Sequence, residues 1–317
     1  MVKWNLGQAA AMGIRPPRTG RSSLWYRIKS NRIAYLFISP WILLFSVFTI
    51  YPLFYSLYVS FTNFNPLKKG SINELVGLDN YRELLTDTNF HTALKNTFVF
   101  AFGTIPLTTV FALLLAVALN QSVKFKALFR VGFFFPTVVS VTVIATLFRL
   151  LLFRDGLLTR LVTALGFEGR NWLLDSQTAL PCIMAMCVWS ATGYYMVIYL
   201  AALQTIPLEL YESSTVDGAG IIRRFVHITL PHLRHVTLYV IVVNTINSLQ
   251  IFTEPQIMTQ GGPVYATTTG VLYLYRQGFS SQRMGYASAI GYVLFLIILA
   301  FALIQTKVLR LDKGVGD

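Results

Sequence analysis

Charged side chains are scarce in this chain of 317 residues, of which only 12% are Asp, Glu, Lys or Arg while 55% are hydrophobic. A soluble domain usually carries roughly 25% charged residues, so this chain has too little polar material to cover a soluble core of its size. The low charge therefore excludes an ordinary soluble protein. It indicates that lipid is the solvent for most of the chain.

Motifs for nucleotide and metal chemistry are also missing. No segment matches G-x-x-x-x-G-K-[S/T], whose backbone cradles phosphates, and none matches the zinc-binding pattern H-E-x-x-H. The two cysteines, Cys182 and Cys187, are five apart in an apolar run and are interpreted as packing residues rather than a disulfide or metal pair. We therefore expect no catalytic site, no metal and no cofactor on this chain.

Acidic residues are almost absent from the apolar runs, in which Glu254 is the only carboxylate. A transporter that works by ion coupling usually carries acids or histidines inside its membrane helices as relays. A single acid near the end of a run gives that mechanism little support, and an ion-coupled secondary transporter acting alone is kept as the alternative. We expect another polypeptide to supply the driving force.

Six apolar runs are long enough to cross a bilayer, whose hydrocarbon core of about 30 Å needs roughly 20 residues of helix. These runs cover residues 33–62, 93–120, 129–153, 180–203, 236–258 and 285–306. Their polarity does not alternate, as it would in transmembrane β-strands. The sequence therefore predicts an all-α membrane protein with six transmembrane helices.

Positive charge is unevenly distributed along the chain, which has a net charge of +13. Lys and Arg gather before the first run, after the second and fourth runs and behind the last run, and the opposite loops hold about half as many. By the positive-inside rule both termini are cytoplasmic, as an even number of spans requires. The distribution argues against nucleic-acid binding. Residues 1–32 lack the apolar centre of a signal peptide and are expected to form a basic cytoplasmic arm.

The loop between the fourth and fifth runs is predicted to contain two short helices. Pro207 suits the first turn of a helix, because its missing N–H is not needed there. Gly218 and Gly220 are expected to break that helix, since glycine takes positive φ without steric cost. A second helix begins at residue 221, and Pro231 is expected to stop or kink it. Such a loop is either a connector at the membrane surface or a docking lever for a cytoplasmic partner.

The same loop resembles the EAA loop of permease subunits in binding-protein-dependent ABC importers. That pattern reads E-A-A, then a glycine, then I-x-L-P, and it is matched by Glu212-Ser213-Ser214, Asp217-Gly218-Ala219 and Ile228-Thr229-Leu230-Pro231. Serines replace both alanines, but serine is small too. Segments 76–85, 129–140 and 258–269 are also similar to the sugar branch of the family. Outside residues 1–32, nearly the whole chain resembles the maltose-transporter type of permease in a form with six spans.

The resemblance implies that residues 33–317 form an ABC permease domain in a bacterial inner membrane. In this family, two homologous permeases form the translocation path, an ATPase dimer binds ATP and Mg²⁺, and a solute-binding protein delivers an oligosaccharide. The loop helix is then a coupling helix that docks on an ATPase. The residues implied in coupling are Glu212, Ser213, Asp217, Gly218 and Ala219.

Polar residues in the fourth and fifth runs are candidates for the substrate path. Asn244, Asn247 and Ser248 share one helix face. The fourth run offers Ser190, Tyr194 and Tyr195. The resemblance favours Ser190 and Tyr194 among them, because sugar contacts in the maltose-type permease come from these two spans. Hydrogen bonding between helices is the alternative role for each residue.

The solute itself is left open by the sequence. The partner permease is another possible location of the sugar site, and glycerol phosphate is the nearest non-sugar competitor. An acidic oligosaccharide is a further alternative, on account of four arginines in and after the third run: Arg149, Arg154, Arg160 and Arg170. Snorkelling and ordinary loop ion pairs explain these arginines equally well.

Overall fold

The computed structural model describes residues 32–70, 72, 74–121, 124–153, 156–166 and 171–310. Within these ranges the chain is built from helices, and the only β contact is an isolated antiparallel bridge between Thr62 and Leu75. The predicted all-α class is confirmed. The chain divides into two compact units, Met1–Ser56 and Leu57–Asp317. Except for Arg32, the predicted N-terminal arm lies outside the described residues.

The first unit contains helix α3 (Arg32–Phe45), a π-helical turn (Ser46–Ile50) and the beginning of α4 (Tyr51–Ser60). Pro40 lies inside α3 without ending it. Large apolar side chains of this helical stretch are exposed, and 63% of Trp41 is accessible. An apolar surface of this kind requires lipid or a protein partner rather than water.

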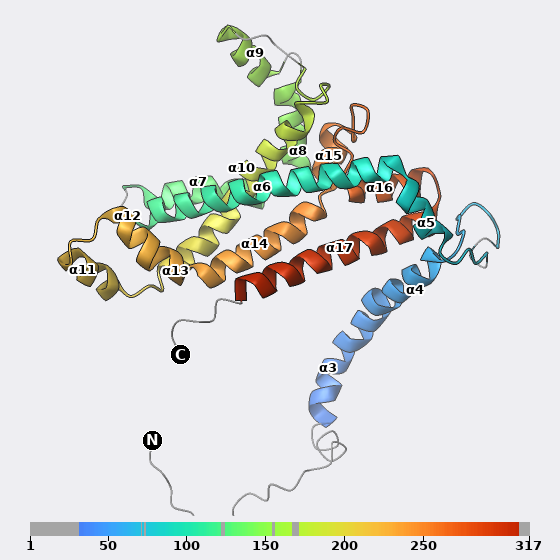
Figure 1. Cartoon of the computed structure of the whole chain (residues 1–317), viewed down its shortest axis with the longest axis horizontal. Coiled ribbons are helices and arrows are strands. Elements are labelled where there is room, and N and C mark those ends of the chain that lie inside the picture. The colour runs from blue at the N-terminus through green and yellow to red at the C-terminus, as the bar shows by residue number, and fades with distance from the viewer. Residues whose placement is uncertain are drawn as a thin grey trace, which may run out of the picture. The chain divides into compact units, whose positions relative to one another are not determined.

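Four long helices dominate the second unit: α6 (Thr88–Asn120), α10 (Ala179–Leu203), α14 (Arg234–Leu249) and α17 (Met284–Arg310). Figure 1 shows them alongside one another, with α6 in contact with α10 and α14, and α14 in contact with α17. Ala112 and Ala116 of α6 are completely buried in one apolar cluster with Tyr199 of α10. Small residues one turn apart let helix backbones approach closely, as is common in membrane bundles.

Shorter helices occupy the ends of this bundle. At the end formed by the C-termini of α6 and α10, Figure 1 shows α11 (Leu208–Val216), α12 (Ile221–Arg224) and α13 (Leu230–His232). At the opposite end it shows α5 (Asp79–Thr86) and α16 (Gly270–Tyr275). The remaining helices are α7 (Lys126–Val138), α8 (Val141–Leu152), α9 (Leu157–Ala164) and α15 (Thr253–Met258).

The sequence predicts six spans, and the described residues contain five candidate spans, or six if one bent pair of helices is counted as a span. Five helical stretches in the described residues are long and apolar enough to cross a membrane: Tyr35–Ser60, Thr88–Asn120, Ala179–Leu203, Arg234–Met258 and Met284–Val308. They correspond to the predicted first, second, fourth, fifth and sixth runs. The sixth candidate corresponds to the third run and counts as a span only if two helices that are bent against each other are taken together.

The third run is not the single helix that its composition predicts. Helix α7 ends at Val138, and the following stretch, Val141–Ala164, turns away from it by 97°. Val139 takes an extended backbone conformation, with φ of −78° and ψ of 140°. Pro136 and the β-branched residues after it have low helix propensity, which lets the chain leave the helix here. Hydropathy reports only the length of an apolar run, so it misses a bend of this kind.

Candidate functional site

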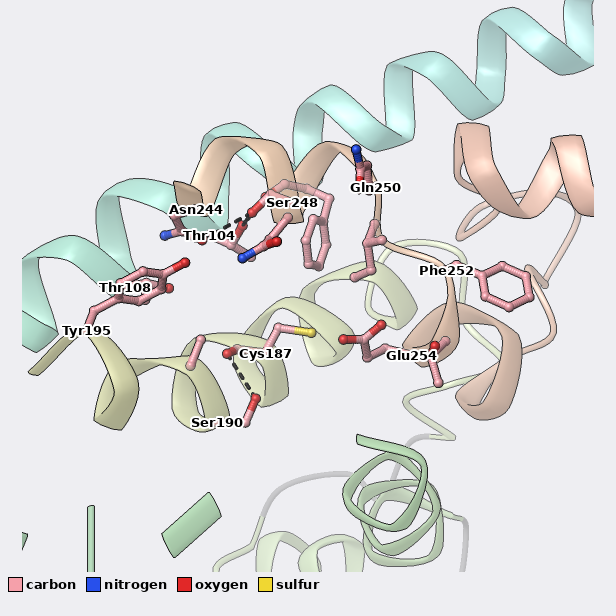
Figure 2. A pocket seen from close by; sticks show the side chains of 15 residues that line it. Thr104, Thr108, Cys187, Ser190, Tyr195, Asn244, Ser248, Gln250, Phe252 and Glu254 are labelled. Atoms are coloured by element: carbon pink, nitrogen blue, oxygen red, sulfur yellow. Dashed lines mark hydrogen bonds between the residues drawn. The ribbon is translucent and has the colours of Figure 1, made fainter. Parts of the chain in front are cut away.

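A cavity of about 320 Å³ lies among α6, α10 and the junction between α14 and α15. Figure 2 shows side chains from all of these elements around it. Its polar lining consists of Thr104, Thr108, Ser190, Tyr195, Asn244, Asn247, Ser248, Gln250, Thr253 and Glu254. Phe100 and Tyr195 add aromatic rings to the lining, whereas the ring of Phe252 packs on Tyr275. Hydroxyls, amides and aromatic rings in one apolar bundle form a site for a polar, uncharged ligand with several hydrogen-bonding groups.

The polar side chains of α14 are bonded to one another but not fully satisfied. Ser248 lies 3.3 Å from the hydroxyl of Thr104 on α6 and donates to Asn244 Oδ1 at 3.4 Å. Asn244 is only 5% exposed, and its Nδ2 has no hydrogen-bond partner in the structure. Buried polar atoms nearly always find a partner. An unpaired amide N–H₂ at a cavity wall therefore points to a ligand or water acceptor.

Non-helical backbone adds to the cavity wall. The helix stops after Leu249 and resumes at Thr253, and Gln250, Ile251 and Phe252 in the break all line the cavity. The hydroxyl of Thr269 donates to the carbonyl of Ile251 at 2.8 Å and so replaces a lost helical bond. Broken backbone at membrane depth is tolerated where protein buries it or where it borders a cavity. In transporters, broken helices of this kind often accompany the binding site.

Four of the five residues predicted for the substrate path line this one cavity: Ser190, Asn244, Asn247 and Ser248. Tyr194 does not, and 43% of its surface is exposed. The next residue, Tyr195, takes its place in the lining. Successive residues of a helix point about 100° apart, so an error of one position moves a side chain off the cavity wall.

Thr104 and Thr108 of α6 also line the cavity, although they were not among the residues predicted from the sequence. They are one turn apart and belong to a longer threonine series, in which Thr97 is also buried. Threonines repeated on one face of an otherwise apolar helix were the available signal. Polar groups cannot face lipid without cost, so such a face must meet protein or a cavity.

The predicted glycine elbow is present between α11 and α12. The N–H of Gly218 donates to Thr215 O at 3.0 Å, and the N–H of Ala219 donates to Ser214 O at 2.9 Å. Gly218 has a φ of 73°. This bond pair around a left-handed residue is the Schellman motif, which ends a helix and strongly favours glycine. Asp217 is the C-cap residue directly before it.

Two side-chain bonds hold the halves of the elbow together. The hydroxyls of Tyr211 on α11 and Thr229 lie 2.9 Å apart. Arg224 Nη1 donates to Thr215 Oγ1 at 3.0 Å. Each bond joins a residue before Gly218 to a residue after it. The two halves of the elbow are therefore expected to move together as a rigid unit.

One detail of the predicted loop is wrong. Gly220 does not have positive φ; its value is −69°, which any residue can adopt. Pro231 was expected to stop or kink the second helix, and α13 ends at His232, with a turn at Leu233 before α14. A π-helical turn (Phe225–Thr229) precedes Pro231, and the chain stays helical into α13. A proline inside a helix has no N–H to donate, and its ring crowds the carbonyl one turn earlier, so a change from regular α-helix beside Pro231 is expected.

Comparison with known families decides what kind of protein carries this cavity and elbow. A family model described as "Binding-protein-dependent transport system inner membrane component" matches residues 108–310, which is more than half of the chain. The chain belongs to this family. The predicted importer permease and its inner-membrane location are thereby confirmed.

Individual relatives of the permease agree with the family assignment. It is 36% identical to the arabinooligosaccharides transport system permease protein AraP of Bacillus subtilis, over 95% of this chain and 96% of that one. It is 34% identical to the lactose transport system permease protein LacF of Rhizobium radiobacter, over 93% and 99% of the two chains. A crystal structure of the bacterial alginate ABC transporter in complex with alginate pentasaccharide-bound periplasmic protein matches with a TM-score of 0.81, 23% identity and coverage of 93% and 99%. This last likeness shows a shared fold.

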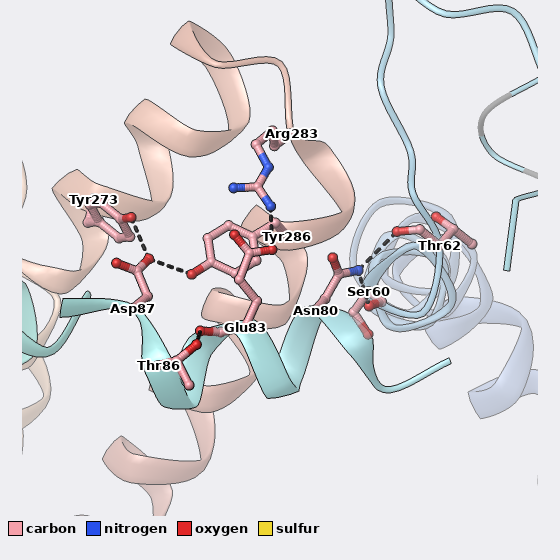
Figure 3. A network of polar contacts seen from close by, with 9 residues as sticks. All are labelled: Ser60, Thr62, Asn80, Glu83, Thr86, Asp87, Tyr273, Arg283 and Tyr286. Atoms are coloured by element: carbon pink, nitrogen blue, oxygen red, sulfur yellow. Dashed lines mark hydrogen bonds and ion pairs between the residues drawn. The ribbon is translucent and has the colours of Figure 1, made fainter. Parts of the chain in front are cut away.

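A second polar cluster of the permease lies at the end of the bundle opposite the elbow. Figure 3 shows Asp87, at the start of α6, between Tyr273 of α16 and Tyr286 of α17. Both hydroxyls donate to Asp87 Oδ2, at 2.6 and 2.5 Å. Asp87 Oδ1 accepts the backbone N–H groups of Asn89 and Phe90, and so caps α6.

Ionisation in this cluster follows from its bonding. Burial raises the pKa of the Asp87 carboxyl, but the bonds from Tyr273, Tyr286 and the two backbone N–H groups outweigh burial and lower the pKa below its usual value. Burial and the bond to Asp87 raise the pKa of Tyr273. Glu83 accepts a 2.5 Å hydrogen bond from Arg283, which raises the pKa of that guanidinium. Asp87 is therefore ionised and both tyrosines protonated at neutral pH.

Two of the four arginines that suggested an acidic solute are described, Arg149 and Arg160, and neither lines the cavity. Arg149 donates from Nη1 to the carbonyl of Ile257 at 3.2 Å, on the last turn of α15. Arg160 is exposed, and Arg154 and Arg170 lie outside the described residues. The one charged side chain among the described lining residues is Glu254.

Proposed function

We propose that this permease forms, together with a second homologous permease, the path by which an oligosaccharide enters the cell. A solute-binding protein delivers the sugar, and a separate ATPase dimer binds and hydrolyses ATP with Mg²⁺. Both termini are cytoplasmic. This chain catalyses no reaction of its own.

The cavity is the observation that carries the proposal. Its amides and hydroxyls match the hydroxyl groups of a sugar, and its aromatic rings match the apolar faces of a sugar ring. The relatives named for arabinooligosaccharides and lactose support a saccharide as the solute. Ser190, Asn244, Asn247 and Ser248 are the proposed sugar contacts, with Tyr195 in place of Tyr194.

The elbow supports a docking role at the cytoplasmic end. Large apolar side chains on either side of the elbow are exposed, with 89% of Val216, 77% of Ile221 and 80% of Ile222 accessible. Clustered exposed apolar residues mark protein interaction sites. We assign ATPase coupling to Glu212, Ser213, Asp217, Gly218 and Ala219, of which all but the half-buried Ala219 are exposed.

The connection between the elbow and the cavity is short and helical. From α12 the chain runs through the π-helical turn and α13 directly into α14, and α14 carries Asn244, Asn247 and Ser248. At 1.5 Å per residue, Asn244 lies only about 16 Å along the helix from residue 233. A displacement of the elbow by the ATPase is thus transmitted to the cavity wall by nearly continuous helix.

Co-purification from native membranes in mild detergent, followed by mass spectrometry, tests this assembly. The proposal predicts a second permease and an ATPase with a P-loop in the same complex. Recovery of the chain alone, under conditions that preserve a known importer of this kind, would contradict it. That result would favour an ion-coupled secondary transporter in which Glu254 is the relay.

A further inference from the structure

Glu254 brings a negative charge to a cavity that is otherwise polar and uncharged. It lies in the first turn of α15, directly after the helix break. Figure 2 shows its carboxylate directed at the sulfur of Cys187. The other described lining residues supply hydroxyls, amides, aromatic rings and apolar groups.

No cation of the described chain neutralises this carboxylate. The ion pairs found there join Lys68 to Glu74, Arg82 to Asp79 and Arg283 to Glu83. Arg149 is the basic residue on α8, the helix that packs against α15, and its guanidinium binds the carbonyl of Ile257 instead. The Cys187 thiol and the backbone N–H of Glu254 itself contact the carboxylate. A carboxylate has about four acceptor positions, so Glu254 keeps positions that can accept from a ligand.

An ionised carboxylate only accepts hydrogen bonds, and adjacent sugar hydroxyls are suitable donors. A carboxylate or sulfate on the ligand offers no such donor. It would also bring a second negative charge into a partly desolvated cavity, where repulsion is much stronger than in water. The cavity thus discriminates by charge as well as by hydrogen bonding.

We propose that Glu254 sets the substrate class of this permease: it binds a pair of hydroxyls of an uncharged oligosaccharide and excludes acidic ones. The inference rests on the proposed function, because it assumes that the cavity is the sugar site. It separates this chain from the alginate transporter, whose fold it shares. A purely structural Glu254, which only begins α15, would have no influence on the charge of the ligand.

Equilibrium binding to the purified permease–ATPase complex, without any binding protein, tests the proposal. The probes are a neutral linear glucose tetrasaccharide and the same tetrasaccharide with its terminal C6 oxidised to a carboxylate. Wild-type complex is expected to bind the neutral sugar at least about tenfold more tightly, which corresponds to about 1.4 kcal/mol. This ratio of affinities for the neutral and the oxidised sugar is measured on the wild-type complex alone, so it does not depend on whether a variant folds.

The variant Glu254→Gln keeps the shape and removes the charge. It should reduce the ratio to about threefold or less, chiefly by tighter binding of the oxidised sugar, while Glu74→Gln, an exposed acid outside the cavity, leaves the ratio unchanged. A wild-type ratio near one, or a ratio that Glu254→Gln does not change, would overturn the assignment of Glu254. Binding of neither sugar, together with ATP hydrolysis that no sugar stimulates, would instead overturn the proposed function.

Discussion

The hydroxyl of Tyr286 donates a 2.5 Å hydrogen bond to Asp87, 199 residues earlier in the chain. Tyr273 donates to the same oxygen at 2.6 Å. One carboxylate therefore joins the beginning of α6 to α16 and α17. These bonds hold one end of the helix bundle together. Their loss should therefore lower the stability of the permease, which can be measured without a transport assay.

Replacement of Asp87 by Asn should lower the free energy of unfolding by about 2 kcal/mol, since hydrogen bonds to a charged acceptor are stronger than those to an amide. The native pKa of Asp87 is lowered, because its bonds outweigh burial. Its stabilisation is therefore complete above the unfolded pKa of about 4 and is lost as the pH falls through the native pKa. Thermal unfolding of the purified complex at pH 7 and below about pH 4 measures both effects.

The control for this prediction is Asp79→Asn, which removes an exposed acid paired with Arg82. Exposed pairs contribute little, so its melting temperature should stay close to wild type. If Asp87→Asn and wild type melted alike at pH 7, the bonds at Asp87 would not be stabilising.

Gly218→Val should abolish sugar-stimulated ATP hydrolysis while the permease still inserts and assembles. A β-branched residue is strongly disfavoured at a φ of 73°, so the elbow must change shape. Gly220→Ala is the matched control, because Gly220 has a φ of −69° and a Cβ there meets nothing within 4 Å. Normal stimulated hydrolysis by Gly218→Val would show that the elbow conformation is not needed for coupling.

Asn247→Ala should raise the KM of sugar uptake about tenfold, which corresponds to one lost hydrogen bond of roughly 1.4 kcal/mol. Tyr194→Phe serves as the comparison, because Tyr194 lies off the cavity wall and the change should leave KM as it is. Uptake of labelled oligosaccharide into proteoliposomes gives both values. A raised KM in Tyr194→Phe together with an unchanged KM in Asn247→Ala would place the sugar on the face of α10 that carries Tyr194.

Tyr211→Phe and Thr229→Val should each lower the number of sugars moved per ATP, since each removes the 2.9 Å bond that ties the two halves of the elbow. The double variant should be no worse than either single one, because both act on the same bond. Additive losses would mean that the two hydroxyls act separately and that their bond does not brace the elbow.

Much of the fold was predictable from apolar length, because a helix that crosses lipid must satisfy its backbone internally and so leaves a long uninterrupted signal. The bend after Val138 was not predictable in this way. It depends on the backbone of Val139 and on packing that composition does not record. The elbow was predictable because Gly218 ends the helix with a positive φ, which glycine adopts most easily. Gly220 was expected to do the same because it is also a glycine, but its φ is −69°.

The cavity was predictable in part. Asn244, Asn247 and Ser248 stood out because polar residues are costly within an apolar run. Thr104 and Thr108 did not, since a threonine in a membrane helix can bond to its own backbone, as Thr104 also does to Phe100 O at 2.8 Å. The choice between Tyr194 and Tyr195 depends on the rotation of α10 about its axis. That rotation is fixed by its neighbours and not by its own sequence.

Uptake of a neutral oligosaccharide can be measured in proteoliposomes that contain the purified complex, with the binding protein on one side and ATP on the other. We expect uptake that requires ATP, the binding protein and an intact Gly218, and that is unaffected when ion gradients are collapsed. Uptake by this chain alone, driven by an ion gradient and lost in Glu254→Gln, would show that the chain is an ion-coupled transporter and not an importer subunit.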